Sequence, residues 1–171
     1  MRKKSREMDT DWAADVLRHA PYITVSFTRE DGTAYGVPLS LAEGEEGVWY
    51  FHAAPEGDKL DCIKHNNLVW LSAVSQCKPM VGPKDGSFTL EYKSAMAQGR
   101  AEIVTDDEER KKGLYVISKR FLPQHMDAFD ESVNRSLHRV VVVRITLVAP
   151  PTGKRKKYDK NGDEMKYGRM E

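Results

Sequence analysis

The segment Tyr22–Ala53, YITVSFTREDGTAYGVPLSLAEGEEGVWYFHA, contains three short runs in which apolar residues alternate with other residues. These runs are residues 22–28, 34–42 and 48–53. Alternation with a period of two is typical of a strand with one buried face, and the Asp31-Gly32 pair is typical of a hairpin turn. The segment therefore predicts three antiparallel strands that follow one another as a meander.

Three further strand patterns follow this segment. We expect them over residues 68–76, 87–104 and 138–148, and Gly99 indicates a bulge within the second. Pro38 interrupts an otherwise regular strand, and because proline has no N–H to donate, it marks a sheet edge or a bulge.

About six strands, with few helices and none placed regularly between strands, favour a mainly β (α+β) fold. Its expected form is a small closed antiparallel barrel, which leaves no sheet edge exposed.

The helix patterns are short and separate from one another. The first covers residues 11–20, and Asp9 or Thr10 can cap it. A second, of about two turns, is expected over residues 58–66. The third begins at a capping box formed by Thr105 and Glu108 and continues with an apolar stripe. These helices are expected to flank the barrel.

Composition restricts the class of protein. The 171 residues include 27 basic and 26 acidic side chains, and this near-neutral balance argues against a nucleic-acid-binding protein. We expect no signal peptide, and no apolar run has the length that a membrane span needs. Cys62 and Cys77 are too few for a disulfide scaffold, which indicates the reducing cytoplasm. We expect one domain over residues 1–150 and a polar, basic tail over residues 151–171, either solvated or laid over a partner.

The residues around the second helix could bind an anion. A helix N-terminus presents unpaired N–H groups and the positive end of the helix dipole, Gly57 would let a ligand approach closely, and Lys59 adds a charge. Gly57-Asp58-Lys59 would also make an ordinary capped helix. His52, at the end of the preceding strand, is either a structural histidine or a donor and acceptor that faces a bound ring.

Other chemistry has little support in the sequence. Cys62 and His65, with Cys77, have no fourth residue at zinc-ligand spacing, so no metal site is expected. The chain contains no Ser-His-Asp arrangement, nucleophile elbow, Walker loop or dinucleotide-binding glycine motif. These absences leave His52 and the Gly57 turn as the candidates.

The order of these motifs resembles a known superfamily. Residues 20–74, with VPLS at Val37–Ser40, YFHAA after the meander and G-x-K-L at Gly57–Leu60, resemble the flavin-binding split-barrel proteins related to pyridoxamine 5'-phosphate oxidase. The start Arg2-Lys3-Lys4-x-Arg6-Glu7-Met8, the later YKSAMAQGRAEIV and the closing VVVVRITLVAPPTGK are more similar to the nitroimidazole-resistance branch. The resemblance covers residues 2–155.

The resemblance implies a six-stranded split barrel that forms a homodimer, with a flavin at each subunit interface and FMN expected rather than FAD. It implies that backbone groups of the strand over residues 34–42, and the end of the strand over residues 48–53, lie along the isoalloxazine ring. The FMN phosphate would then lie at the start of the helix over residues 58–66. The implied ring contacts are Val37, Pro38, Leu39, Ser40, Phe51, His52 and Ala53. The implied phosphate contacts are Gly57, Asp58, Lys59 and Leu60, and the contributors across the dimer are Tyr92, Ser94 and Gly99.

Two departures from the family pattern bear on function. Oxidases of the superfamily carry Ser-Arg-Lys where this chain has Gly57-Asp58-Lys59, so one positive charge is missing. The oxidases' arginine-rich C-terminal segment is also missing, which argues against pyridoxal phosphate synthesis. We expect an FMN-dependent oxidoreductase that reduces a small nitroaromatic or related acceptor, with His52 in the catalytic role. The alternatives are a non-catalytic flavin- or haem-binding split barrel and a structural dimer that has lost its cofactor.

Overall fold

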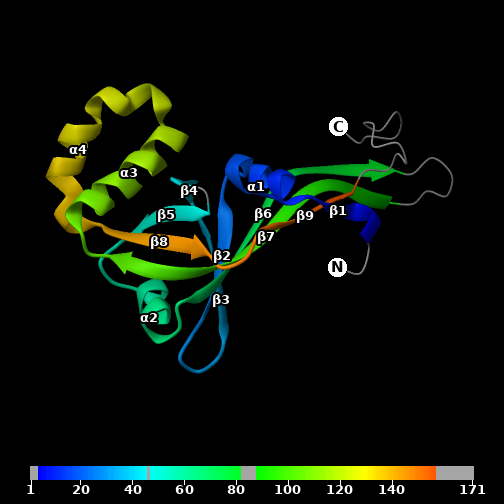
Figure 1. Ribbon diagram of the computed structural model, residues 1–171, viewed down its shortest axis with the longest axis horizontal. Coiled ribbons are helices and arrows are strands. Elements are labelled where there is room, and N and C mark those ends of the chain that lie inside the picture. The colour runs from blue at the N-terminus through cyan, green and yellow to red at the C-terminus, as the bar shows by residue number, and fades with distance from the viewer. Residues whose placement is uncertain (1–3, 46, 82–87, 157–171) are drawn as a thin grey trace. The chain divides into compact units, whose positions relative to one another are not determined.

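The computed structural model describes residues 4–45, 47–81 and 88–156 (Figure 1). Contacts between Cα atoms divide the chain into two compact units. The larger unit contains residues Tyr22–Leu71 and Ala97–Pro150. The smaller unit contains the described parts of Met1–Pro21, Ser72–Met96 and Pro151–Glu171. The described residues after 150 therefore belong to the same unit as two earlier segments of the chain.

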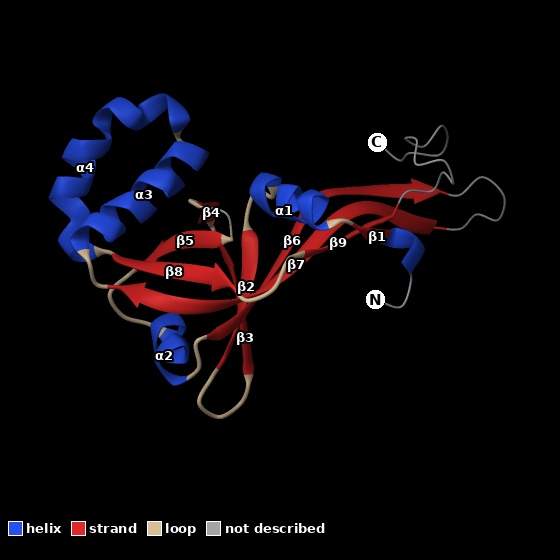
Figure 2. Ribbon diagram, in the orientation of Figure 1, coloured by secondary structure: helices blue, strands red, loops and turns tan. Residues whose placement is uncertain are grey.

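The described strands form one antiparallel sheet with flanking helices (Figure 2). Its order is β3-β2-β6-β7-β8-β5-β4, and β9 pairs with both β7 and β1. The main strands are β2 (Ile23–Thr28), β3 (Ala34–Leu39), β5 (Val48–Ala53), β6 (Leu68–Val81), β7 (Phe88–Val104) and β8 (Val141–Leu147). The short strands are β1 (Glu7–Met8), β4 (Ala42–Glu43) and β9 (Thr152–Lys156). The predicted mainly β, antiparallel fold is confirmed.

Two details of that prediction were wrong. The described residues form nine strands rather than six, because three short segments in expected turns and termini also pair with the sheet. The strand order is an open path that ends at β3 and β4, so the sheet has edges. Pro38 was predicted to mark a sheet edge or a bulge, and it lies in β3, at the edge of the sheet.

The hairpin of β2 and β3 follows from its sequence. The two strands pair in regular register from Ile23 opposite Leu39 to Thr28 opposite Ala34. At the turn, Gly32 has φ of 82°, and the backbone N–H of Gly32 donates to Arg29 O at 2.9 Å. This left-handed conformation favours glycine, which explains the predicted Asp-Gly turn.

In the larger unit, β5 and β8 separate two buried layers. On one face, Trp49 and Phe51 are fully buried, as is Ile145 of β8. On the other face, Tyr50 and Val142 join a cluster that α3 (Asp107–Phe121) covers through Ile117. Burial of large apolar side chains on both faces is the main source of stability for these strands.

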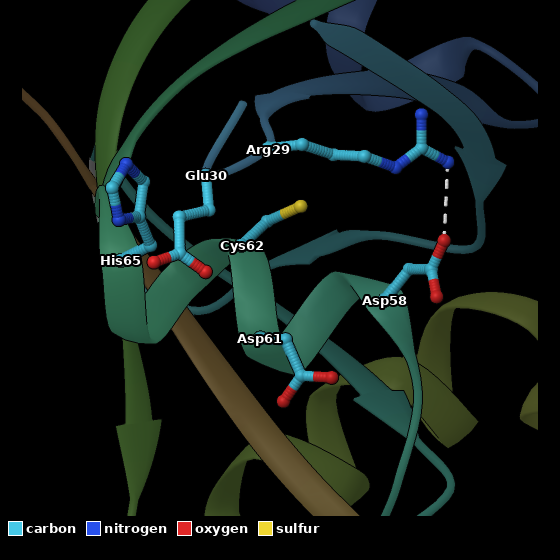
Figure 3. Close-up of a pocket in the computed structure, with 6 residues that line it drawn as sticks. All are labelled: Arg29, Glu30, Asp58, Asp61, Cys62 and His65. Atoms are coloured by element: carbon cyan, nitrogen blue, oxygen red, sulfur yellow. Dashed lines mark hydrogen bonds and ion pairs between the residues drawn. The ribbon is translucent and has the colours of Figure 1, made fainter. Parts of the chain in front are cut away.

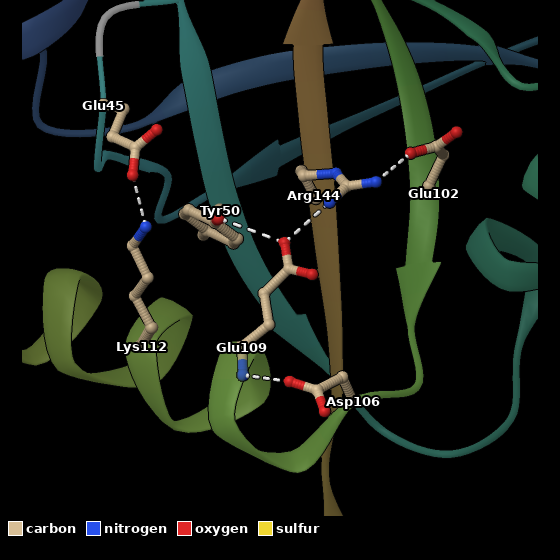
Figure 4. Close-up of polar contacts among 7 residues, drawn as sticks. All are labelled: Glu45, Tyr50, Glu102, Asp106, Glu109, Lys112 and Arg144. Atoms are coloured by element: carbon tan, nitrogen blue, oxygen red, sulfur yellow. Dashed lines mark hydrogen bonds and ion pairs between the residues drawn. The ribbon is translucent and has the colours of Figure 1, made fainter.

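A polar network crosses the α3-covered face (Figure 4). The Tyr50 hydroxyl donates to Glu109 Oε1 at 3.2 Å, and Arg144 Nη1 donates to the same oxygen at 2.8 Å. The other end of the Arg144 guanidinium donates to Glu102. Nearby, Lys112 pairs with Glu45 at 2.5 Å. These bonds fix α3 to β5, β7 and β8.

The helical segments after β7 depart in part from the sequence prediction. Asp106, not Thr105, caps α3, and its carboxylate accepts the Glu109 N–H at 2.8 Å. The predicted capping box was wrong by one residue, because both residues at this position can accept a hydrogen bond. The helices after α3 were not predicted: η2 (Pro123–Ala128), α4 (Phe129–Ser136) and η3 (Leu137–Arg139).

The predicted bulge at Gly99 is not present in the pairing of β7 with β8. The register runs without interruption from Gly99 opposite Leu147 to Val104 opposite Val142. A Cβ atom at residue 99 would lie 2.5 Å from Ile145 Cγ2 and 3.1 Å from the Thr146 carbonyl oxygen. Close packing against β8 therefore accounts for the glycine.

The smaller unit contains η1 (Lys4–Arg6), β1, α1 (Thr10–His19), β9 and the outer parts of β6 and β7. Of the two caps that the sequence allowed, Asp9 or Thr10, Asp9 caps α1 by accepting the Trp12 N–H at 2.8 Å. A Cβ atom added to Gly153 in β9 would lie only 2.7 Å from Trp12 Cε3. The Trp12 side chain therefore packs tightly against the β9 backbone, which holds α1 on β9. Residues 157–171 of the predicted tail lie outside the described residues, whereas residues 152–156 form β9.

Within the described residues, no helix has both the length and the apolar character that a membrane span requires.

Candidate functional site

The start of α2 (Asp58–His65) has the backbone geometry of an open helix N-terminus. Gly57 is the N-cap residue, with φ of 131°, and no side chain caps the helix. Nothing lies within 4 Å of the position that a Cβ of Gly57 would take. The first N–H groups of a helix have no partner within the helix, so a small anion could approach them here.

Arg29 is the residue that the sequence analysis missed. It follows β2 directly, and its Nη2 donates to Asp58 Oδ2 at 3.1 Å (Figure 3). Its Cζ lies 4.4 Å from the centroid of the Tyr35 ring, an arrangement that holds the guanidinium by a cation–π contact. No sequence motif links Arg29 to Asp58, because they lie 29 positions apart with a hairpin between them.

The side chains of Arg29 and α2 enclose a shallow cavity of about 210 Å³. In Figure 3, the Arg29 side chain extends along α2 toward Asp58, and the Cys62 sulfur points toward it. The lining residues are Arg29, Glu30, Asp58, Asp61, Cys62 and His65. The cavity is thus polar, with both signs of charge on its walls.

Two side chains that line the cavity, Arg29 and Cys62, have shifted pKa values. The hydrogen bond to Asp58 raises the pKa of Arg29 above its usual value, so the guanidinium stays charged. Burial raises the pKa of the Cys62 thiol, and the nearby Arg29 opposes this effect. Cys62 is therefore a neutral, buried thiol. Among the described residues, no three histidine, cysteine, aspartate or glutamate side chains are placed to hold a metal ion.

The predicted ring contacts of β3 lie at the sheet edge. Val37 and Leu39 are half-buried, whereas Pro38 and the following Ser40 are exposed. β3 pairs with β2 on one side in the strand order. An edge strand has backbone N–H and C=O groups without a ladder partner, and these could bind the polar edge of a heterocycle.

The predicted contacts of β5 face in different directions. Phe51 and Ala53 are buried on the sheet face of Trp49, while His52 is exposed and alternates to the face of Tyr50. The structure therefore does not bring the His52 and Phe51 side chains to one surface. His52 opposes Val142 of β8 at the strand end.

The remaining predicted residues belong to different environments. Leu60 is buried and Lys59 half-buried in α2. Tyr92 and Ser94 belong to the smaller unit, where their backbones pair with β9 and the Ser94 hydroxyl donates to Lys154 O at 3.4 Å. Gly99 is buried against β8 in the larger unit.

Comparison with known proteins identifies the family. The family model described as pyridoxamine 5'-phosphate oxidase matches residues 9–153. The chain belongs to the pyridoxamine 5'-phosphate oxidase family. No curated protein matches the chain.

Solved structures share the fold of this family member. A Bacteroides thetaiotaomicron protein assigned to 5-nitroimidazole antibiotic resistance is 23% identical, with a TM-score of 0.72 over 87% of this chain and 86% of that chain. A FAD- and haem-binding protein from Mycobacterium smegmatis is 18% identical, with a TM-score of 0.75 over 90% and 74%. A flavocytochrome from Azotobacter vinelandii is 16% identical, with a TM-score of 0.74 over 90% and 72%. These likenesses support the split-barrel fold.

The α2 start, taken without the neighbouring carboxylates, has room and donors for a small anion. The uncapped α2 start and Lys59 supply N–H donors and charge, and Gly57 leaves space for an anion. The Arg29–Asp58 pair joins the β2–β3 hairpin to α2. The edge strand β3 and the start of α2 are therefore connected within one unit.

Proposed function

We propose that this protein is a homodimeric FMN-binding oxidoreductase that reduces a small nitroaromatic or a related electron acceptor. The observation that carries the proposal is the open α2 start beside Arg29, in a chain that belongs to the pyridoxamine 5'-phosphate oxidase family. The structural likeness to a protein assigned to 5-nitroimidazole resistance supports the choice of acceptor.

In this proposal, the chain binds and orients the cofactor at two ends. The N–H groups at Gly57 and Asp58 and the Lys59 ammonium bind the phosphate, while β3 backbone groups from Val37 to Ser40 contact the ring. Flavin, when bound, would accept electrons from an external reductant and pass them to the acceptor. Among the described residues proposed for the ring end, His52 has the exposed imidazole that could hold a proton for the acceptor.

A cofactor assay tests the proposal most directly. Purified protein should be yellow and release FMN on denaturation, and added FMN should bind to any colourless fraction. Supply of a reduced nicotinamide or a reductase should then support nitroimidazole loss. Protein that stays colourless and does not bind added FMN would contradict the proposal. Full turnover in His52→Ala would remove His52 from the catalytic role without affecting cofactor binding.

The second candidate is a flavin- or haem-binding protein without catalysis. Two solved structures with TM-scores above 0.7 are named for haem as well as flavin or as a flavocytochrome, and this observation favours the alternative. A Soret absorption band after addition of haem, lost in His52→Ala, would support it. Bound FMN that neither reduced nicotinamide nor a reductase reduces would also favour binding over catalysis.

A further inference from the structure

The chain that follows β3 is attached to one face of α3. A spacing of four residues puts Lys112, Val116 and Arg120 along the same face of the helix, one turn apart. At the first of these positions, Lys112 pairs with Glu45 (Figure 4). At the last, Arg120 Nη1 donates a hydrogen bond to the carbonyl oxygen of Leu41. This face of α3 therefore contacts the chain between Leu41 and Glu45 at both of its ends.

Arg120 contacts the chain only two residues after the end of β3. Its side chain is half-buried, and its Cζ lies 4.9 Å from the centroid of the Phe121 ring. Burial lowers the pKa of the Arg120 guanidinium, and the charge of Glu43 opposes this effect. A cation that is partly removed from water needs hydrogen-bond acceptors, and the Leu41 carbonyl is one of them. The bond therefore orients the backbone at Leu41 as well as the guanidinium.

The end of β3 lies between two anchors. On one side, the pairing of β3 with β2 continues as far as Leu39 opposite Ile23, and β3 is an edge of the sheet. On the other side, Leu41 has a fully buried side chain, and its N–H donates to Leu39 O at 3.2 Å. The exposed Ser40 lies between these anchors. Its backbone orientation therefore depends on how Leu41 is held.

We propose that Arg120 is a positioning residue for the isoalloxazine ring, because it fixes the backbone from Leu39 to Leu41 in the orientation that contacts the ring. This inference rests on the proposed flavin function, in which backbone groups from Val37 to Ser40 contact the ring, and it adds a residue of α3 that acts through Leu41. Groups that contact a ligand must be held to within about 0.5 Å, and hydrogen bonds from neighbouring residues provide this support. Loss of the Arg120 bond should therefore weaken the contact with the ring.

A purely structural role for Arg120 is the competing explanation. In that case the bond to Leu41 would contribute to the free energy of unfolding, and a folded variant would bind flavin as wild type does. A positioning role predicts a lower affinity in the folded protein. Riboflavin has the same ring and ribityl chain as FMN without the phosphate, so a change confined to the ring should affect both ligands by the same factor.

The test measures the affinity of the folded, full-length protein for FMN and riboflavin by quenching of flavin fluorescence. Arg120→Met removes the donors and keeps an apolar stem. We expect it to weaken the binding of both ligands by about fivefold or more, a part of the tenfold or so that a hydrogen bond from a charged group contributes. The absorption spectrum of bound FMN should also differ from that of wild type, because it responds to the groups around the ring.

Lys119→Met is the matched control. Lys119 is the exposed neighbour of Arg120 on α3, its Nζ lies 5.8 Å from the centroid of the Tyr115 ring, and its replacement removes the same charge. This variant should leave both affinities and the spectrum of bound FMN unchanged. A loss equal to that in Arg120→Met would mean that the charge of α3, rather than the bond to Leu41, is responsible.

A second variant keeps the test decisive if Arg120→Met does not fold. Arg120→Lys keeps the charge but presents a single ammonium group in place of the planar guanidinium, so it should weaken the binding of both flavins by about twofold or more. Unchanged FMN affinity in a folded Arg120 variant, or a loss for FMN alone, would overturn the positioning role. Wild-type protein that binds neither flavin would instead overturn the proposed function, and the inference with it.

Discussion

At the scale of single residues, Gly99 shows how packing alone can require a glycine. Its backbone lies so close to β8 that an added Cβ would be 2.5 Å from Ile145 Cγ2, a branched and fully buried side chain that has little freedom to move. This close contact explains the residue without a cofactor. The family resemblance placed Gly99 near the flavin, a prediction that stays open.

Gly99→Ala should therefore destabilise the protein by about 1–3 kcal/mol, the usual cost of overpacking a core. Urea unfolding would measure the change. Gly36→Ala in β3 is the control, because its Cβ would meet no atom closer than 3.7 Å. We expect the control to stay within about 0.5 kcal/mol of wild type. Equal effects of the two substitutions would show that Gly99 is not tightly packed.

Tyr50 makes stability depend on pH in the alkaline range. Burial, and then Glu109, raises the pKa of the Tyr50 phenol above its usual value of 10.0. Between the unfolded and folded pKa values, the folded protein keeps a proton that the unfolded chain has lost. The free energy of unfolding therefore falls as pH rises above about 10.

Tyr50→Phe separates this effect from the other groups that titrate in the same range. At pH 8 the substitution should cost about 1 kcal/mol, the value of the lost hydrogen bond to Glu109. The gap between variant and wild type should narrow from pH 10 to 11, because the variant has no phenol to ionise. Denaturant unfolding at each pH measures both curves. Parallel curves would contradict a raised pKa for Tyr50.

At the scale of elements, the N-cap of α3 is a residue that the sequence pattern did not identify correctly. Asp106 accepts the Glu109 N–H, whereas the sequence pattern placed Thr105 in this role. Asp106→Ala should lower the free energy of unfolding by about 1 kcal/mol, the usual contribution of an N-cap. Thr105→Ala is the matched control and should change it by less than about 0.5 kcal/mol. Urea unfolding of both variants gives the comparison, and a larger loss from Thr105→Ala would reverse the assignment.

Local sequence patterns correctly predicted those strands and helices whose formation depends mainly on residues close by in the sequence. The strand Val48–Ala53 has the predicted bounds, and α2 ends one residue before the expected position. Alternation and turn chemistry act within a few residues, so they are visible in the sequence. Pro38 was placed at an edge for the same reason.

Elements that depend on distant partners were not predictable in this way. β9 is a polar, basic segment, TGKRK, and it is a strand because β7 and β1 pair with it. The Arg29–Asp58 pair depends on a hairpin that brings residue 29 beside α2. The sequence thus indicated the helix start of the candidate site but not the Arg29–Asp58 ion pair beside it.

At the scale of the whole molecule, the smaller unit exposes apolar side chains that bear on the proposed homodimer. Val74 of β6 and Leu90 and Met96 of β7 are exposed, on strands whose alternate residues Ala73 and Ala95 are buried. Phe88 is 83% exposed. Exposed apolar side chains on a sheet are common in protein–protein contacts, and a second copy of this chain is the partner that we propose.

Leu90→Asp combined with Met96→Asp should convert the dimer to a monomer, because two carboxylates from each subunit would have to be desolvated in the contact. Sedimentation velocity of the full chain measures the mass directly. Leu122→Asp, an exposed apolar position after α3, is the matched control and should stay dimeric. A wild-type monomer would contradict the homodimer. A dimer that persists in the double variant would place the contact elsewhere, since buried charges at its centre would prevent association.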